Sequence, residues 1–356
     1  MDTVRNRLDY VLKHNIILQK IYKHSMSLLF QFIGVFIKTD KKLILFNGHS
    51  QKYNDSPRAI FEYILRNKKN EEYKYVWALD EPDKYDIPNC TKIKMDTVKY
   101  FYVTLKAGYW VSCVNIERGL RFKKRQTRYL NTWHGTPIKK VGNAVDGRKD
   151  FDFSNIDLFC YASDYEKQIY LRDFNVKKNS LIATGLPRND ELYDSQRDEV
   201  DKIKKMLGIK KGKKVILYAP TWRDSVDGGN SYIIKPPIDI AFWEDQLKDD
   251  YVLLLRTHAY TNKLMGIEFI NHLLKIADFL ISDYSAVIFD YAILEKPIIC
   301  FAYDYDDYVK ERGLYIEIDK EIPGGILRTQ EAVIEKIKNI DYQEECIKVS
   351  QFKEKY

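Results

Sequence analysis

The sequence lacks the short motifs that identify several large enzyme classes. It has no G-x-x-x-x-G-K-[ST] phosphate loop and no G-x-G-x-x-G after its first expected strand. These absences argue against a P-loop nucleotide hydrolase and against a classical dinucleotide-dependent dehydrogenase. The six histidines are isolated, with no H-x-x-x-H spacing and no cysteine partner nearby. We therefore expect neither a metal site nor a cofactor.

Paired cysteines and membrane-spanning runs are also missing. The five cysteines are scattered without a C-x-x-C pair, and several lie in apolar, strand-like runs. Buried, reduced thiols of this kind are typical of a reducing compartment. Residues 1–22 are polar and evenly charged, so we expect no signal peptide. The apolar stretch 26–37 is shorter than the ~20 residues that span a bilayer, and we expect a peripheral protein on the cytoplasmic side of the membrane.

Positive charge is concentrated near the N-terminus. The whole chain carries +7, and residues 1–42 alone carry eight Lys or Arg against three Asp, a balance of +5. An apolar helix flanked by cations fits in-plane attachment to an anionic membrane surface, but it could equally pack on the protein's own core. A second group of cations could serve the same membrane surface or an anionic acceptor. This group, the basic cluster, consists of Arg118, Arg121, Lys123, Lys124 and Arg125, followed by Arg128.

Short apolar runs alternate with helical patterns along the rest of the chain. This alternation predicts an α/β fold with parallel sheets that carry helices on both faces. A charged segment near residue 200 separates two such series, which predicts two Rossmann-like lobes facing across a cleft. We expect a basic amphipathic segment at 1–40, an acceptor-binding lobe at 41–197 and a donor-binding lobe at 198–356. The expected strands are 42–46, 75–79, 109–114, 129–133, 158–162, 180–184, 214–218, 251–255, 278–282, 297–301 and 315–318.

The segment 131–140 is the most informative stretch of the chain. It ends an expected strand with His134 and continues through Gly135, Thr136 and Pro137, a turn expected to begin a helix. A titratable base beside the positive end of a helix could deprotonate a hydroxyl next to an anionic donor. The same residues could also form an ordinary turn from a strand into a helix.

Further polar motifs follow other expected strands, at residues 184–190, 218–224, 256–258 and 282–285. Because ligands of parallel sheets bind where the strands end, these motifs predict one anion-binding active site with several arginines. Ser285 would lie at or near the start of a helix over 286–295, where free backbone N–H groups favour a diphosphate. Ser285 could also be a plain helix cap.

The combination of these motifs resembles the CDP-glycerol glycerophosphotransferase family, whose enzymes build teichoic acids and related polymers. The resemblance runs from about residue 46 to residue 313, with the motifs in the family's order. The matching motifs are Trp133-His134-Gly135-Thr136-Pro137-Ile138-Lys139-Lys140, Gly185-x-Pro187-Arg188-Asn189-Asp190, Ala219-Pro220-Thr221-Trp222-Arg223, Arg256-x-His258 and Ser282-Asp283-Tyr284-Ser285-x-x-x-Phe289-Asp290-Tyr291.

The resemblance implies a GT-B fold and attachment to the inner membrane face, where a lipid-linked acceptor waits. It also implies which residues line the CDP-glycerol site. Ala286 departs from the serine or threonine often found there, which removes one hydroxyl contact. The implied residues are His134, Gly135, Thr136, Pro137, Ile138, Arg188, Pro220, Thr221, Arg256, Thr257, His258, Ser285, Ala286 and Asp290.

The resemblance suggests a reaction in which His134 or His258 deprotonates an acceptor hydroxyl that attacks CDP-glycerol and releases CMP. The acceptor would be an undecaprenyl-diphosphate-linked saccharide, and the short chain favours a primase over a polymerase. Other readings remain open: a polymerase that uses CDP-glycerol or CDP-ribitol, a nucleotide-sugar glycosyltransferase, and a non-catalytic module that tethers an anionic lipid. A nucleic-acid partner is not expected, because the charge lies beside an apolar helix rather than along an aromatic groove.

Overall fold

The computed structural model describes residues 15–67, 72–193, 197–221, 237–256 and 270–356. These residues form two compact units. Unit 1 comprises the described parts of Met1–His134 together with Phe153–Tyr161 and Val176–Arg188, and unit 2 comprises Gly135–Asp152, Ala162–Asn175 and the described parts of Asn189–Tyr356. The boundaries expected at residues 40 and 197 stay a prediction, and segments 135–152 and 162–175 group with unit 2.

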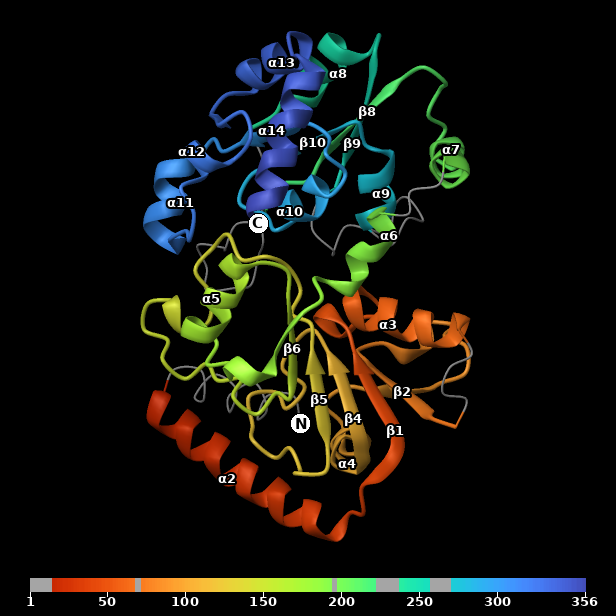
Figure 1. The fold of residues 1–356 in the computed structure, drawn as a ribbon, viewed down its shortest axis with the longest axis vertical. Coiled ribbons are helices and arrows are strands. Elements are labelled where there is room, and N and C mark those ends of the chain that lie inside the picture. Colours follow the sequence, from red (N-terminus) through yellow and green to blue (C-terminus); the bar gives the residue numbers. More distant parts are fainter. Residues whose placement is uncertain (1–14, 68–71, 194–196, 222–236, 257–269) are drawn as a thin grey trace. The chain divides into compact units, whose positions relative to one another are not determined.

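Unit 1 is built on a seven-stranded sheet in which all neighbouring strands are parallel (Figure 1). Its strand order, β3-β2-β1-β4-β5-β6-β7, begins as in a Rossmann sheet. The order reverses between β1 and β4: β1 to β3 follow one another toward one side of the sheet, and β4 to β7 toward the other. The strands are β1 (Asp40–Asn47), β2 (Lys74–Leu79), β3 (Thr91–Lys94), β4 (Ala107–Ser112), β5 (Arg128–Asn131), β6 (Leu158–Tyr161) and β7 (Leu181–Ala183).

Aromatic side chains fill much of the core of unit 1. Phe46 of β1 stacks on Trp77 of β2 with ring centroids 5.4 Å apart, and Phe61 of helix α3 (Asp55–Arg66) meets both rings edge-on. All three side chains are fully buried. Helix α4 (Val98–Lys106) connects β3 to β4, with the Thr97 hydroxyl accepting from the backbone N–H of Tyr100 as its N-cap.

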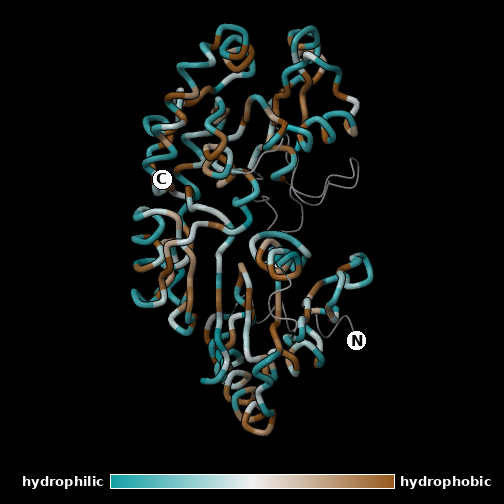
Figure 2. The backbone as a smooth tube through the Cα atoms, turned by 45° about the vertical axis from the view of Figure 1, so that its right-hand side comes forward, coloured by the Kyte–Doolittle hydropathy of each residue, from teal (hydrophilic) through white to brown (hydrophobic). Residues whose placement is uncertain are grey.

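Helix α2 (Ile16–Phe36) precedes the first strand and docks on unit 1 by one narrow stripe. Phe30 stacks on Phe101 with centroids 4.6 Å apart, and Gly34 lies close to Leu105. The Ser27 hydroxyl accepts from the backbone N–H of Arg121. Hydrophobic residues recur along the helix (Figure 2). Its remaining faces leave many large apolar side chains in solvent, namely Ile17, Leu18, Ile21, Tyr22, Leu28, Leu29, Phe32, Ile33, Val35 and Phe36. The helix therefore packs on the core and also presents an apolar surface.

Unit 2 contains a five-stranded parallel sheet in the order β12-β11-β10-β8-β9. Counted within the unit this is the doubly wound order 2-1-3-4-5 read from the other side, and it reverses between β8 and β10. The two sheets confirm the expected α/β fold of two Rossmann-like lobes. The strands are β8 (Lys214–Tyr218), β9 (Tyr251–Leu255), β10 (Phe279–Ser282), β11 (Ile298–Phe301) and β12 (Ile326–Leu327).

Helices cover both faces of this sheet and bury two apolar clusters. Phe279 and Leu280 are neighbours on β10, and they belong to different clusters because successive residues of a strand point to opposite faces. Leu280 packs in the cluster that contains Leu217, and Phe279 in the cluster that contains Trp243 of α8. The helices of unit 2 are α5 (Asp164–Asp173), α6 (Asp190–Tyr193), α7 (Arg197–Met206), α8 (Ile240–Leu247), α9 (Ile270–Ile276), α10 (Val287–Ala292), α11 (Tyr305–Arg312), α12 (Ile318–Glu321), α13 (Gln330–Lys338) and α14 (Tyr342–Lys355).

Two expectations about local structure were wrong. No helix begins at Gly135–Pro137, because the following residues extend and form a β-bridge from Lys139 to Leu314, supported by the hydrogen bond from the Tyr315 N–H to the Ile138 carbonyl. The strand expected over 315–318 is absent for the same reason. The isolated bridge is formed by Leu314, directly before this stretch, and α12 begins at Ile318.

Candidate active site

Two histidines meet at the edge of unit 1 where its central strands end. His49 follows β1, Cys113 follows β4 and His134 follows β5, and these three strands are neighbours in the sheet. The rings of His49 and His134 have centroids 4.7 Å apart. This place adjoins the reversal of strand order between β1 and β4, where α/β sheets bind their ligands.

The hydrogen bonds of His134 determine which of its nitrogens can act as a base. Nδ1 lies 2.9 Å from the backbone carbonyl oxygen of Cys113. A carbonyl only accepts, so Nδ1 carries the proton and Nε2 is left with the lone pair. Burial and the neighbouring His49 lower the pKa of His134 to about 4. The imidazole is therefore a neutral base throughout the physiological range.

Arg188 binds the backbone of His134. Its Nη1 donates to the carboxylate of Asp55 at 2.8 Å and to the carbonyl oxygen of His134 at 2.9 Å. Both members of the ion pair are nearly buried, with 13% and 10% of their side chains exposed. Burial alone would raise the pKa of Asp55, but Arg188 and the Ser56 N–H lower it on balance. Arg188, implied as a substrate ligand, thus also positions the histidine.

The backbone around this site is unusually strained. Ser50, Gln51, Asp55 and Trp133 all have positive φ values between 51° and 61°, a region that non-glycine residues rarely adopt. Gly48 starts the loop after β1, and a Cβ on it would lie 2.2 Å from the carbonyl oxygen of Lys52. Such conformations persist only where the surroundings enforce them, and they commonly occur at functional sites.

In unit 2, two strand-end motifs are joined by one carboxylate. Asp283, directly after β10, accepts from the backbone N–H groups of Thr221 at 2.8 Å and Tyr284 at 2.7 Å. It is buried, so its role is to hold the loop after β8 against the loop after β10. Thr221 is buried and Pro220 is partly exposed. These residues flank the reversal of strand order in this sheet.

The helix expected to begin near Ser285 is present but shorter than predicted, and diphosphate binding at its start stays a prediction. The Ser285 hydroxyl accepts from the Val287 N–H at 3.3 Å, and Ala286 is the N-cap of the six-residue helix α10. Asp290, on the same helix, is buried and accepts from the Asn189 amide at 2.6 Å. Its position favours a structural role, and its implied contact with substrate stays a prediction.

Arg256 is well placed to attract an anion. It follows β9, and burial lowers its pKa to about 10, so the guanidinium stays charged at neutral pH. No salt bridge joins it to a carboxylate within the described part of the chain. Thr257 and His258, the next two residues of this motif, lie outside the described residues. His258 therefore remains only a candidate base.

The residues after His134 belong mainly to the interior of unit 2. The Thr136 hydroxyl donates to Glu166 at 2.6 Å, the Pro137 carbonyl accepts from the Tyr165 hydroxyl, and Ile138 is a core residue. Gly135 has a φ of 148°. Their implied contacts with CDP-glycerol remain predictions, and in the structure their side chains fix the segment that leaves the histidine.

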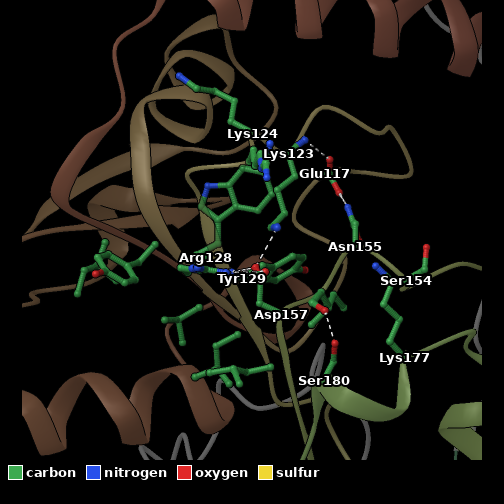
Figure 3. Close-up of a pocket in the computed structure, with 18 of the residues that line it drawn as sticks. Glu117, Lys123, Lys124, Arg128, Tyr129, Ser154, Asn155, Asp157, Lys177 and Ser180 are labelled. Carbon is green, nitrogen blue, oxygen red and sulfur yellow. Dashed lines mark hydrogen bonds and ion pairs between the residues drawn. The ribbon is translucent and has the colours of Figure 1, made fainter.

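The basic cluster lies at the end of the unit 1 sheet where strands β4 to β7 begin, whereas His134 lies at the end where the strands stop. The cluster adjoins a cavity of about 950 Å³ (Figure 3). Lys123 pairs with Asp157 at 2.9 Å inside this cavity, and Arg118 pairs with Asp96 on the surface. Lys124 donates to the Ile37 carbonyl at the end of α2. Arg121 and Arg125 are exposed. The cluster thus adjoins α2 and is remote from His134.

Sequence reasoning missed His49 and Asp55. Neither belongs to a motif that the family resemblance singled out, and the loop that carries them is defined by backbone conformation. The only sequence signal was Gly48 directly after an expected strand, which marks a tight turn. Across the described residues, no three His, Cys, Asp or Glu side chains are grouped as metal ligands would be.

Comparison with known proteins identifies the family. A family model described as CDP-glycerol:poly(glycerophosphate) glycerophosphotransferase matches residues 29–356. A teichoic acid poly(glycerol phosphate) polymerase of Bacillus spizizenii is 34% identical over 92% of this chain and 89% of its own length. A teichoic acid glycerol-phosphate transferase of Staphylococcus aureus is 33% identical over 91% and 90%. A solved variant of the wall teichoic acid polymerase TagF, soaked with CDPG, is 31% identical over 98% and 93%, with a TM-score of 0.79.

The matched region includes the histidine site of unit 1 and the strand-end motifs of unit 2. Two relatives share about a third of their residues with the chain over nine tenths of its length. The family expected from the motifs is thereby confirmed. This chain belongs to the CDP-glycerol:poly(glycerophosphate) glycerophosphotransferase family and is a CDP-glycerol glycerophosphotransferase.

Proposed function

We propose that the protein transfers glycerol phosphate from CDP-glycerol to a hydroxyl of a membrane lipid-linked acceptor in teichoic acid synthesis, with His134 as the general base. The observation that carries the proposal is the hydrogen bond from His134 Nδ1 to the Cys113 carbonyl, which leaves Nε2 free of its proton. The soaking of TagF with CDPG supports CDP-glycerol as the donor.

The step needs one base and several cations. The acceptor oxygen attacks the β-phosphorus while its proton passes to Nε2 of His134. The bond between the β-phosphorus and the oxygen that bridges to the α-phosphate breaks, and CMP leaves with that oxygen. Arg256 and the backbone N–H groups near Ser285 would neutralise charge on the phosphates.

We also propose that α2 and the basic cluster attach the protein to the anionic inner face of the cell membrane. None of the helices in the described ranges could cross a bilayer. The exposed apolar side chains of α2 lie beside the exposed cations Arg121 and Arg125, which is the composition of an interfacial helix. The position of the cluster at the sheet edge opposite His134 favours the membrane over a role at the reacting groups.

Which acceptor is used is a finer question. The reaction expected from the sequence is the first addition to a saccharide lipid, the primase reaction. The names of the two relatives that span most of the chain, a polymerase and a transferase, favour an acceptor that already carries glycerol phosphate. Both reactions use the same base and donor, so acceptor preference alone separates them.

The test of the base is a His134→Gln variant assayed by CMP release. General-base catalysis contributes about 10²- to 10⁴-fold, so we expect turnover to fall by at least about 10²-fold while CDP-glycerol still binds. Because the neutral imidazole is the active form, the wild-type rate should fall only as the pH drops toward about 4. His24→Gln on exposed α2 is the matched control. Near-normal turnover of His134→Gln would move the role to His258.

The test of the acceptor compares unprimed saccharide lipid, the same lipid with one glycerol phosphate, and no lipid. CMP release only with the unprimed lipid establishes a primase, and release with the primed lipid establishes a polymerase or a single-addition transferase. Release only from CDP-ribitol or a nucleotide sugar would contradict the proposed donor.

A further inference from the structure

His49 is a second imidazole at the site that the proposed reaction leaves without a role. Its ring packs on that of His134 with a centroid separation of 4.7 Å and an interplanar angle of 43°, and the centroid of the Trp133 ring lies 4.0 Å from that of His134. His134 therefore contacts two aromatic rings and the Cys113 carbonyl. Its orientation depends on all three contacts.

The loop that carries His49 is built to fix its position. Gly48 has no room for a side chain, and Ser50 and Gln51, directly after His49, hold positive φ values. The Ser50 hydroxyl lies 3.2 Å from Nδ1 of His49. A strained, tightly closed loop thus places an imidazole against the proposed base, and strain of this kind commonly occurs at functional sites.

We propose that His49 is a positioning residue for His134: its imidazole fixes the orientation of the His134 ring and disfavours protonation of that ring. The inference rests on the proposed role of His134 as base. Two imidazoles in contact cannot both be charged without repulsion. As the pH falls, a protonated His49 therefore opposes protonation of His134 and extends the range in which His134 can accept a proton.

The other charges that face the pair come from three parts of unit 1. Asp55 on α3 favours the protonated form of both rings, whereas Arg188 after β7 disfavours it. Lys52 acts on His49 in the same direction as Arg188, and burial acts on both rings. Burial lowers the pKa of His49 as well, so both imidazoles are neutral at pH 7.

The test uses the full-length protein with His49→Ala and His49→Phe. His49→Ala removes the ring, whereas His49→Phe keeps an aromatic ring and removes the titrating group. We measure kcat and KM for CMP release across pH, and follow His134 by NMR of ¹³C-labelled histidine. The His134 signal is assigned by its loss in His134→Gln, among the six histidines of the chain. Thermal unfolding checks the fold, and His24→Ala is the matched control.

We expect His49→Ala to lower kcat by about 10- to 100-fold with little change in KM, since misplacing a catalytic group by ~1 Å costs on the order of 10²-fold. His49→Phe should recover most of this loss at pH 8. In both variants the titration midpoint of His134 should move up toward the ordinary value, and the acid limb of the rate profile should move with it.

Three other results would be decisive. Unchanged kcat and an unchanged His134 titration in folded His49→Ala would overturn the proposal. A raised KM with kcat unchanged would also overturn it, because His49 would then bind substrate. If the His134 titration moves but the rate profile does not follow, the contact between the rings stands and the role of His134 as base fails.

Discussion

At the scale of single residues, the Asp55–Arg188 pair links the stability of unit 1 to its chemistry. Asp55→Asn leaves a nearly buried guanidinium without its counterion and loosens the carbonyl of His134. We expect the free energy of unfolding to fall by about 3–5 kcal/mol, the usual cost of breaking a buried pair. The rate of CMP release should fall as well. Denaturant unfolding and the CMP assay provide the two measurements.

The control for this variant is Asp96→Asn, which breaks the half-exposed pair with Arg118 and should cost only about 0–1 kcal/mol. The pKa of Asp55 is depressed in the folded state, so its contribution is present above the unfolded pKa of about 3.9 and is lost as the pH falls through the lower folded value. Equal losses in the two variants would show that the Asp55–Arg188 pair has no special role.

Residues of the candidate site could be predicted only where they belong to a recognisable sequence motif. His134, Arg188 and Arg256 could be chosen because each follows the end of an expected parallel strand, where such sheets bind ligands. Asp55 could not, because an aspartate before a helical Ser-Pro is an ordinary helix start. Its function comes from a contact across 133 positions of sequence to Arg188, which no local pattern encodes.

At the scale of elements, α2 exposes apolar side chains that the rest of the described fold does not cover. Phe32, Val35 and Phe36 are 64%, 78% and 74% exposed. Replacing all three with serine should weaken binding to anionic vesicles by well over 10-fold, since a fully buried side chain of this size is worth about 1.5–3 kcal/mol. Co-sedimentation with vesicles measures this, and CMP release from a water-soluble acceptor analogue should persist.

Met206→Ser is a suitable control for α2, because that side chain is also exposed but lies on α7. Vesicle binding that survives the triple substitution would assign the apolar face of α2 to another partner. These point variants are sharper than deletion of residues 1–38, because deletion also removes the docking contacts of Ser27 and Phe30.

Most strands and the order of elements followed from the sequence, because buried parallel strands are nearly continuous apolar runs. Strand 91–94 was missed because Thr-Lys-Ile-Lys has only one core residue, Ile93. The 3-residue to 5-residue strands were placed within about two positions. The helix expected after His134 failed because backbone pairing with residues 313–315, distant in sequence, outweighed the local Gly-Thr-Pro signal.

At the scale of the whole molecule, the uneven charge makes a prediction about salt. With +5 of the net +7 in residues 1–42, attachment to an anionic membrane should weaken as salt is raised. Each Lys or Arg near such a surface contributes about 1 kcal/mol, and screening shortens the range of the interaction to about 10 Å at 0.1 M salt. Vesicle binding should therefore fall steeply between about 0.05 and 0.5 M NaCl.

Zwitterionic vesicles serve as the reference for this experiment, since they offer apolar surface without net charge. Binding that is equal on both kinds of vesicle and insensitive to salt would contradict an electrostatic contribution. It would leave the apolar face of α2 as the whole of the attachment.

The chain changes between the two units five times, and two of these changes come directly after His134 and directly after Arg188. The Arg188 guanidinium donates a hydrogen bond to the His134 carbonyl, so these two segments at which the chain leaves unit 1 are bonded to each other within that unit. Descendants of this gene could therefore gain or lose residues in the exposed stretch 145–150, but an insertion beside either segment would shift the histidine off its partners. Length variation in the family should avoid these two positions, whatever changes elsewhere on the surface.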